Sequence, residues 1–312
     1  MQIDGATSVY GIIGDPVAHS LSPLMQNAAF AAKNIPAVYV AFHVASTGLA
    51  AAVAGLRSLG VKGANVTIPH KESVCPFLDA IDSSAELIGA VNTIVNTAGQ
   101  LVGYNTDGLG LLRSLKADLN VTLNATSEVI ILGAGGAARA AVVALAQQGV
   151  RSITILNRSE HRAQALVARY SGVFPQVTFR ALNFNSGLPN THGGVAGGGF
   201  NDDSTSNCKQ LTNFLKKCHL IVNSTSIGLS GESFNVLPWE DVNKKAVVFD
   251  MIYAAQPTPL VSAATTAGFF ACDGLGMLAA QGEAAFELWT GQCVDGLMRA
   301  ALEQHVAVMA SC

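Results

Sequence analysis

Residues 129–139 read Val-Ile-Ile-Leu-Gly-Ala-Gly-Gly-Ala-Ala-Arg, and this stretch decides the fold. Four apolar residues stop at a glycine turn, and an alanine-rich segment with a helical pattern continues through Gln148. Strand, tight turn and helix in this order are the context that a dinucleotide-binding fingerprint requires. Gly133 permits the turn, Gly135 leaves room for a pyrophosphate, and the small Ala138 lets helix and strand pack closely. The stretch predicts a nucleotide site; the alternative is a strand-to-helix turn that binds nothing.

The next predicted strand, 152–156, indicates which nucleotide is bound. A site that selects NAD usually carries an acidic side chain about 20 residues after the glycines, where it binds the ribose 2′-hydroxyl. This chain has Asn157 there, followed by Arg158 and Arg162. A guanidinium matches a 2′-phosphate in charge and geometry, which favours NADP over NAD. The alternative is that both arginines are solvated residues of a first helical turn, where cations are disfavoured.

Composition excludes several functional classes. The chain has 312 residues, of which 50% are hydrophobic and 12% charged, with a net charge of −3. This length suits two domains, and the charge gives no reason to expect a nucleic-acid or membrane partner. The six cysteines are scattered, so we expect neither a disulfide framework nor a metal site. Without a signal-peptide pattern, the sequence predicts a cytoplasmic protein.

The first hundred residues alternate short apolar strands with helical patterns, which predicts an α/β fold with a mostly parallel sheet. Ser22 is expected to cap a helix whose first residue is Pro23. The predicted strands are 9–13, 38–42, 63–68, 90–95 and 101–104, and the predicted helices are 22–33, 47–58, 71–78 and 83–88.

The second part of the chain follows a similar alternation with one interruption. A helix from Asp107 leads into the nucleotide unit, whereas residues 185–207 are rich in Gly, Asn, Ser and Asp and are interpreted as a flexible surface insertion. Further strands are expected at 220–222 and 246–249, and further helices at 209–217, 275–289 and 294–309.

Polar residues follow two of the predicted strands in the first part. Ligands of open α/β sheets bind outside the carboxyl ends of strands, and Lys71 and Asp107 both fall at such ends. If they face each other, the pair could hold a substrate hydroxyl and move its proton while a hydride leaves the carbon. The alternatives are a surface lysine and a helix-capping aspartate.

A loop that enters the first helix carries His19 and two serines, Ser20 and Ser22. Hydroxyl groups together with helix amides suit a carboxylate ligand. Helix capping by the serines is an equally good explanation, and a lone loop histidine is more often structural or solvated than a base.

At this point the chain resembles the shikimate dehydrogenase family over nearly its whole length, except for the glycine-rich insertion. The matching segments occur in the family's order, and together they are far more specific than any one of them. They are 19–23 (HSLSP), 65–72 (NVTIPHKE), 91–93 (VNT), 105–108 (NTDG), 133–139 (GAGGAAR), 157–159 (NRS), 223–228 (NSTSIG), 250–253 (DMIY) and 273–278 (DGLGML).

The resemblance implies roles for individual residues. Lys71 and Asp107 would be the catalytic pair and would also contact the substrate. The substrate carboxylate would be bound by Ser20, Ser22 and Tyr253, and the ring hydroxyls by Thr67, Asn92, Asp107 and Gln281. The NADP site would be lined by Gly133, Ala134, Gly135, Gly136, Ala137, Asn157, Arg158, Ser159, Arg162, Thr225, Met251 and Gly274.

The resemblance also implies an architecture and a reaction. The expected substrate-binding domain comprises residues 1–106 completed by 274–312, and the Rossmann-type NADP-binding domain comprises 107–273. The family reduces 3-dehydroshikimate to shikimate reversibly with NADPH and without a metal, in a monomer or homodimer. Two alternatives stay open: a quinate/shikimate dehydrogenase with relaxed NAD or NADP use, and a non-catalytic NADP-sensing protein that keeps the fold.

Overall fold

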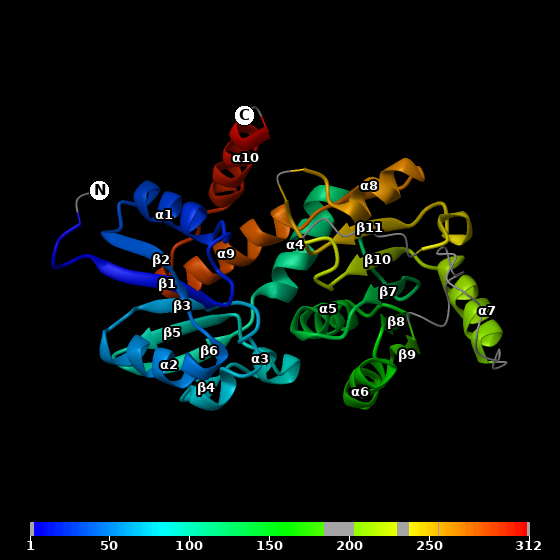
Figure 1. The fold of residues 1–312 in the computed structure, drawn as a ribbon, viewed down its shortest axis with the longest axis horizontal. Helices are drawn as coiled ribbons and strands as arrows, with labels where there is room; N and C mark the ends of the chain where they lie inside the picture. Colours follow the sequence, from blue (N-terminus) through cyan, green and yellow to red (C-terminus); the bar gives the residue numbers. More distant parts are fainter. Residues whose placement is uncertain (1–2, 184–202, 230–236, 255, 311–312) are drawn as a thin grey trace, which may run out of the picture. The chain divides into compact units, whose positions relative to one another are not determined.

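The computed structural model describes residues 3–183, 203–229, 237–254 and 256–310, with only the backbone of 203–208, and Figure 1 labels its helices and strands. The chain divides into two compact units. The first comprises Met1–Ser114 and Leu275–Cys312, and the second comprises Leu115–Gly274. Among the described residues, no helix is both long and apolar enough to cross a membrane.

The first unit contains a six-stranded mixed sheet in the order β2-β1-β3-β5-β6-β4. Parallel pairing joins β1 to β2 and β3, and β4 to β6, whereas β5 runs antiparallel to both its neighbours. The carboxyl ends of β1, β3 and β6 therefore meet the start of β5 at one edge of the sheet. The strands are β1 (Ser8–Gly14), β2 (Ala37–His43), β3 (Gly63–Val66), β4 (Ala80–Ile81), β5 (Thr93–Thr97) and β6 (Gln100–Tyr104).

Apolar side chains bury both faces of this sheet, as expected for a sheet covered by helices. One core joins Tyr10 and Tyr39 of the strands to Phe30 of α1, Phe286 of α9 and Met298 of α10. The other core joins the opposite sheet face to α2. The helices are α1 (Ser22–Ala32), α2 (Leu49–Ser58), α3 (Ser83–Ile88), α4 (Asp107–Leu119), α9 (Leu275–Thr290) and α10 (Leu297–Ala310).

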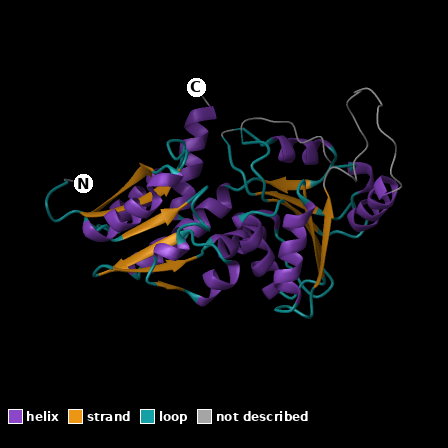
Figure 2. Cartoon of the chain, turned by 60° about the horizontal axis from the view of Figure 1, so that its bottom comes forward, coloured by secondary structure: helices purple, strands orange, loops and turns teal. Residues whose placement is uncertain are grey.

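The second unit is a parallel sheet in the order β12-β11-β10-β7-β8-β9. Numbered within the unit and read from β9, this is the 3-2-1-4-5-6 order of the Rossmann fold, which confirms the predicted fold class. In Figure 2 its strands are orange and its helices purple. The strands are β7 (Glu128–Leu132), β8 (Ser152–Asn157), β9 (Thr178–Asn183), β10 (Leu220–Asn223), β11 (Val247–Asp250) and β12 (Phe270–Cys272), and the helices are α5 (Gly136–Gln147), α6 (Glu160–Ser171), α7 (Asp203–Leu215) and α8 (Pro259–Thr266).

Three local predictions in the first unit are wrong. Ser22 is the first residue of α1 rather than its N-cap, because Ser20 Oγ already accepts the Ser22 backbone N–H at 3.3 Å. The predicted helix 71–78 is absent: turns lead into a 3₁₀ helix at Cys75–Phe77, where Pro76 has no N–H to continue an α-helix. Strand β3 ends at Val66, two residues earlier than predicted.

The predicted insertion 185–207 falls mostly outside the described residues, since 184–202 are not described. Its last part is corrected, because α7 begins at Asp203 rather than at Lys209. Asp, Ser and Asn in this segment suggest a loop, but they are also tolerated in the first turns of a helix.

The indole of Trp289 in α9 packs closely against β3 at Gly63. A Cβ at Gly63 would overlap the indole ring, and Trp289 Nε1 donates a hydrogen bond to the Ile94 carbonyl at 2.9 Å. We expect Gly63→Ala to lower the free energy of unfolding by about 1–3 kcal/mol, the usual cost of overpacking a core. Urea unfolding measures the change.

Gly55 in α2 is the matched control for this substitution. A Cβ there meets nothing within 4 Å, so Gly55→Ala should stabilise the protein by about 0.5–1 kcal/mol through helix propensity. Equal effects of the two substitutions would show that the contact of Trp289 with β3 is not tight.

Candidate functional site

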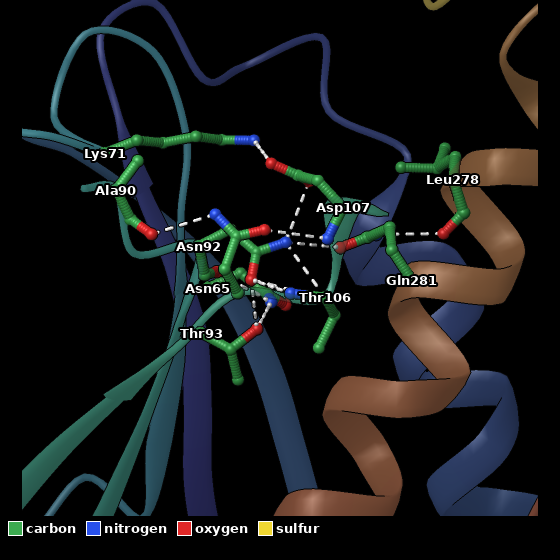
Figure 3. A network of polar contacts seen from close by, with 10 residues as sticks. Asn65, Lys71, Ala90, Asn92, Thr93, Thr106, Asp107, Leu278 and Gln281 are labelled. Atoms are coloured by element: carbon green, nitrogen blue, oxygen red, sulfur yellow. Dashed lines mark hydrogen bonds and ion pairs between the residues drawn. The ribbon is translucent and has the colours of Figure 1, made fainter. Parts of the chain in front are cut away.

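The structure brings Lys71 and Asp107 together. Lys71 Nζ lies 2.6 Å from Asp107 Oδ2 (Figure 3). The Asp107 side chain is 6% exposed and that of Lys71 19% exposed, so the ammonium is the more accessible partner. The two residues are 36 positions apart in sequence. They meet because each follows a strand, β3 or β6, that ends at the same edge of the first sheet. The pair is therefore a partly dehydrated ion pair with one face available to a ligand.

Backbone geometry fixes the position of each partner. Asp107 is the first residue of α4, where the helix dipole favours a carboxylate. The Asp107 N–H donates to Asn105 Oδ1 at 3.0 Å, and Asn105 Nδ2 donates to the Ala90 carbonyl at 2.9 Å. Next to Ala90, the Val91 N–H donates to the Lys71 carbonyl at 2.7 Å. The loops that carry the ammonium and the carboxylate are thus joined through residues 90–91.

Asn92 orients the carboxylate from the other side. Its Nδ2 donates to Asp107 Oδ1 at 2.8 Å and to Thr106 Oγ1 at 2.9 Å, and it lies 3.4 Å from Gln281 Oε1. Asn92 Oδ1 accepts the Thr106 backbone N–H at 2.9 Å, which settles which end of the amide is oxygen. With Oδ1 of Asp107 held in this way, Oδ2 is the oxygen that faces Lys71.

Gln281 reaches this network because α4 and α9 pack closely. A Cβ at Gly110 of α4 would lie 2.9 Å from both Gln281 Cβ and the Met277 carbonyl, so only glycine fits without a shift. Gln281 Nε2 donates to the Leu278 carbonyl at 2.9 Å, which leaves Oε1 directed at Asn92 (Figure 3). Four residues of the predicted site, Lys71, Asn92, Asp107 and Gln281, are therefore in one network.

The predicted carboxylate-binding serines lie in the loop after β1. Ser20 is half-buried and its Oγ accepts from the Ser22 backbone, whereas Ser22 is buried. Thr67 follows β3, and its N–H donates to the Ile13 carbonyl at 3.0 Å. These residues belong to the same unit as the Lys71–Asp107 pair, but among the described residues neither Ser20 nor Thr67 forms a hydrogen bond with the pair.

The glycine turn of the second unit fits a bound pyrophosphate. Gly133 has φ +107°, and a Cβ there would lie 2.8 Å from Ser224 Oγ, so glycine is required on both counts. By contrast, a Cβ at Gly135 meets nothing within 4 Å, and no side chain caps α5 at this residue among those described. There is therefore open space beside Gly135 at the start of α5, and Ala138 of the same helix is fully buried.

The predicted 2′-phosphate residues lie where β8 passes into α6. Asn157 ends β8, and its Nδ2 donates to the Ser159 carbonyl at 2.9 Å. Arg158 and Arg162 are exposed and flank the start of α6, and neither forms an ion pair with a described residue. Two unpaired cations beside a helix N-terminus fit a doubly charged phosphate.

A buried carboxylate that the sequence analysis did not single out organises the loops after β10 and β11. Asp250 accepts from Asn223 Nδ2 at 2.9 Å, from the Ile252 N–H at 3.1 Å and from Thr258 Oγ1 at 2.7 Å. Burial raises the pKa of Asp250 above its ordinary value, although these three donors act to lower it. Its position in the Asp-Met-Ile-Tyr segment was the only signal available in the sequence.

Three predicted NADP-lining residues are positioned around this carboxylate. Asn223 Oδ1 accepts from the Thr225 hydroxyl at 2.7 Å. A Cβ at Gly274 would overlap the Met251 carbonyl, and the Gly274 N–H donates to the Ile252 carbonyl at 2.9 Å. Tyr253, predicted to bind the substrate carboxylate, follows in the same loop of the second unit. Among the described residues, no group of three or more His, Cys, Asp or Glu could hold a metal ion.

Three family models match this chain in the order of its units. The shikimate dehydrogenase substrate binding domain matches residues 12–94, and shikimate / quinate 5-dehydrogenase matches residues 116–185. The shikimate 5′-dehydrogenase C-terminal domain matches residues 274–295. The matched ranges contain Lys71 and the glycine turn.

Relatives match over the whole chain. A shikimate dehydrogenase (NADP(+)) of Geobacter metallireducens is 46% identical over 300 residues, which is 96% of this chain and 97% of the relative. The solved Thermus thermophilus shikimate 5-dehydrogenase in complex with NADP(H) and shikimate is 31% identical with a TM-score of 0.78, covering 96% of this chain and 99% of that one. The Listeria monocytogenes enzyme in complex with shikimate and NAD is 30% identical with a TM-score of 0.82, covering 98% of each chain. The chain therefore belongs to the shikimate dehydrogenase family.

Proposed function

We propose that this chain is an enzyme that interconverts 3-dehydroshikimate and shikimate with NADPH and NADP⁺, with Lys71 and Asp107 as catalytic residues. The observation that carries the proposal is the 2.6 Å contact between Lys71 Nζ and Asp107 Oδ2 within a network that includes Asn92 and Gln281. The relatives named as NADP-dependent shikimate dehydrogenases support the substrate and the cofactor.

The pair can hold the alcohol oxygen of shikimate and manage its proton. NADP⁺, when bound, supplies the acceptor for the hydride that leaves the alcohol carbon. The hydroxyl proton must also leave: Asp107 Oδ2 can receive it directly, or Lys71 Nζ can receive it once its ammonium has passed a proton to Asp107 Oδ2. In the opposite direction the same two atoms return the proton to the carbonyl oxygen. Because Asn92 fixes Oδ1, the carboxylate is oriented before substrate binds.

The other polar groups of the first unit suit the rest of the substrate. We assign Thr67, Asn92 and Gln281 to the ring hydroxyls, since amide and hydroxyl groups can both donate and accept. We assign Ser20, Ser22 and Tyr253 to the carboxylate. The first unit is then the substrate-binding domain, and its expected boundary at residue 106 lies within eight residues of the division at Ser114.

We assign the second unit to NADP. The turn from Gly133 to Ala137 would bind the pyrophosphate, and the segment Asn157–Arg158–Ser159 together with Arg162 would bind the adenosine end. Thr225, Met251 and Gly274 would lie along the nicotinamide end, since β10 and β11 are on the other side of β7 from β8. A cytoplasmic location and a monomer or homodimer stay predictions.

An absorbance assay tests the proposed function. Purified protein is mixed with NADP⁺ and either shikimate or quinate, and NADPH formation is followed. We expect rapid formation with shikimate and at most slow formation with quinate. Comparable rates with both would favour the quinate/shikimate alternative, which the name of the second family model includes. No formation with either substrate over a broad pH range would favour a non-catalytic NADP-binding protein.

A further inference from the structure

A row of hydrogen bonds crosses one face of the first sheet and ends on Asp107. The Tyr39 hydroxyl donates to Asn65 Oδ1 at 2.7 Å, and Asn65 Nδ2 donates to Thr93 Oγ1 at 3.1 Å. The Thr93 hydroxyl then donates to Asn92 Oδ1 at 2.8 Å, and Asn92 Nδ2 donates to Asp107 Oδ1 at 2.8 Å. Figure 3 shows the part of this row from Asn65 to Asp107.

Every bond in the row points the same way. Each middle residue accepts from the residue before it and donates to the next one, so the dipoles add toward the carboxylate of Asp107. Tyr39, Asn65, Thr93, Asn92 and Asp107 are all 5% exposed or less. In such a low-dielectric setting, successive hydrogen bonds polarise and strengthen one another, and a missing partner is costly.

The first member of the row is held from several sides. Asn27 of α1 bonds the backbone of Tyr39 twice, donating to its carbonyl and accepting from its N–H, both at 2.8 Å. The ring contacts Trp289, with centroids 6.0 Å apart.

The Tyr39 hydroxyl remains a donor at working pH. Burial raises the pKa of Tyr39 well above its ordinary value. The phenol therefore keeps its proton for Asn65.

We propose that Tyr39 is a positioning residue of the active site, which orients Asp107 through Asn65, Thr93 and Asn92. This inference rests on the proposed function, because it takes Asp107 as catalytic. Tyr39 itself lies in β2 and touches neither member of the Lys71–Asp107 pair.

Removing the hydroxyl should loosen the row from its start. In Tyr39→Phe, Asn65 Oδ1 loses its hydrogen-bond donor while remaining buried, which is unfavourable. Rotation of the Asn65 amide away from Thr93 then becomes less costly, because the present orientation no longer satisfies Oδ1 through Tyr39. We expect kcat/KM for shikimate to fall about 5- to 30-fold, in the upper part of the range for substitutions along a coupled network. The KM for NADP⁺ should stay the same, because the row contacts no residue assigned to the cofactor.

Tyr10→Phe is the matched control. Tyr10 pairs with Tyr39 across neighbouring strands, is also buried and also contacts Trp289, at a centroid distance of 5.3 Å. Its hydroxyl bonds none of the described residues. We expect Tyr10→Phe to leave kcat/KM within twofold of the unchanged protein.

A double-mutant cycle with Thr93→Val separates positioning from a general effect on stability. Thr93→Val interrupts the row between Asn65 and Asn92 with a side chain of the same shape. In that background, Tyr39→Phe should lower kcat/KM by clearly less than in the unchanged protein, because the side-chain route is cut and only the 3.1 Å bond from Asn65 Nδ2 to the Asn92 carbonyl still joins Asn65 to Asn92. Effects that simply multiply, or a Tyr39→Phe variant as active as Tyr10→Phe, would overturn the inference while leaving the proposed function intact.

The same double-mutant cycle can also be measured through folding stability, without an activity assay. Urea unfolding of the four proteins gives the coupling between Tyr39→Phe and Thr93→Val in folding stability, and we expect the two losses to be clearly less than additive. If the unchanged protein oxidises no shikimate, the proposed function fails. Additive stability losses are a separate result, and they would show that the hydrogen-bonded row does not act as a unit.

Discussion

We expect Lys71→Ala to lower kcat for shikimate oxidation by about 10²- to 10⁴-fold, the usual contribution of a general acid or base. The substitution removes the ammonium that lies 2.6 Å from Asp107 Oδ2 and leaves the carboxylate anchored by Asn92. The substrate hydroxyl would then lose its cationic partner while the orientation of Asp107 is kept. Initial rates at saturating NADP⁺ and shikimate measure the loss.

Two controls make this result specific to the site. Lys62 lies just before β3 on an exposed position of the same unit, so Lys62→Ala should retain normal turnover. The affinity of Lys71→Ala for NADP⁺, measured by fluorescence titration, should barely change, because Lys71 belongs to the first unit and the predicted NADP residues belong to the second. Near-normal turnover of Lys71→Ala would remove this lysine from the mechanism.

The sequence was sufficient to predict the Rossmann-type unit because its signals are local. The run 129–139 contains the strand, the turn and the helix start in order, and β7 and α5 follow within a residue or two of the prediction. The strands β9 and β12 and the helix α8 were missed. Apolar and polar residues are mixed in β9, β12 has only three residues and α8 only eight, so each gives a weak local pattern, and pairing with β8 and β11 stabilises the two strands.

The candidate site shows the same division between local and non-local information. Lys71 and Asp107 each follow a predicted strand, and this placement predicted that they could face each other. The structure brings them together. The helix expected at Lys71 is absent, because the turn is set by contacts of its backbone with Val91. No spacing rule could show that Tyr39, 26 residues before Asn65, donates to it, since this depends on the strand order β2-β1-β3.

We expect Arg158→Ala to weaken NADP⁺ binding by about 1.5–3 kcal/mol, the size of a hydrogen bond to a charged group. At 1.4 kcal/mol for each factor of ten, this is about a 10- to 150-fold rise in Kd. Arg158 is exposed, directly follows β8 and pairs with no described carboxylate, so its charge is free to meet a 2′-phosphate. Binding of NAD⁺, which lacks that phosphate, should change little.

Arg151→Ala provides the control from the opposite end of the same strand. Arg151 precedes β8, is also exposed, and lies 4.0 Å from Glu128, whereas dinucleotides bind at the carboxyl ends of parallel strands. Its removal should alter neither cofactor's Kd. Equal losses of NADP⁺ and NAD⁺ affinity in Arg158→Ala would mean that this arginine supports the loop rather than the phosphate, and Arg162, one turn further on at the start of α6, would then be the residue that selects NADP.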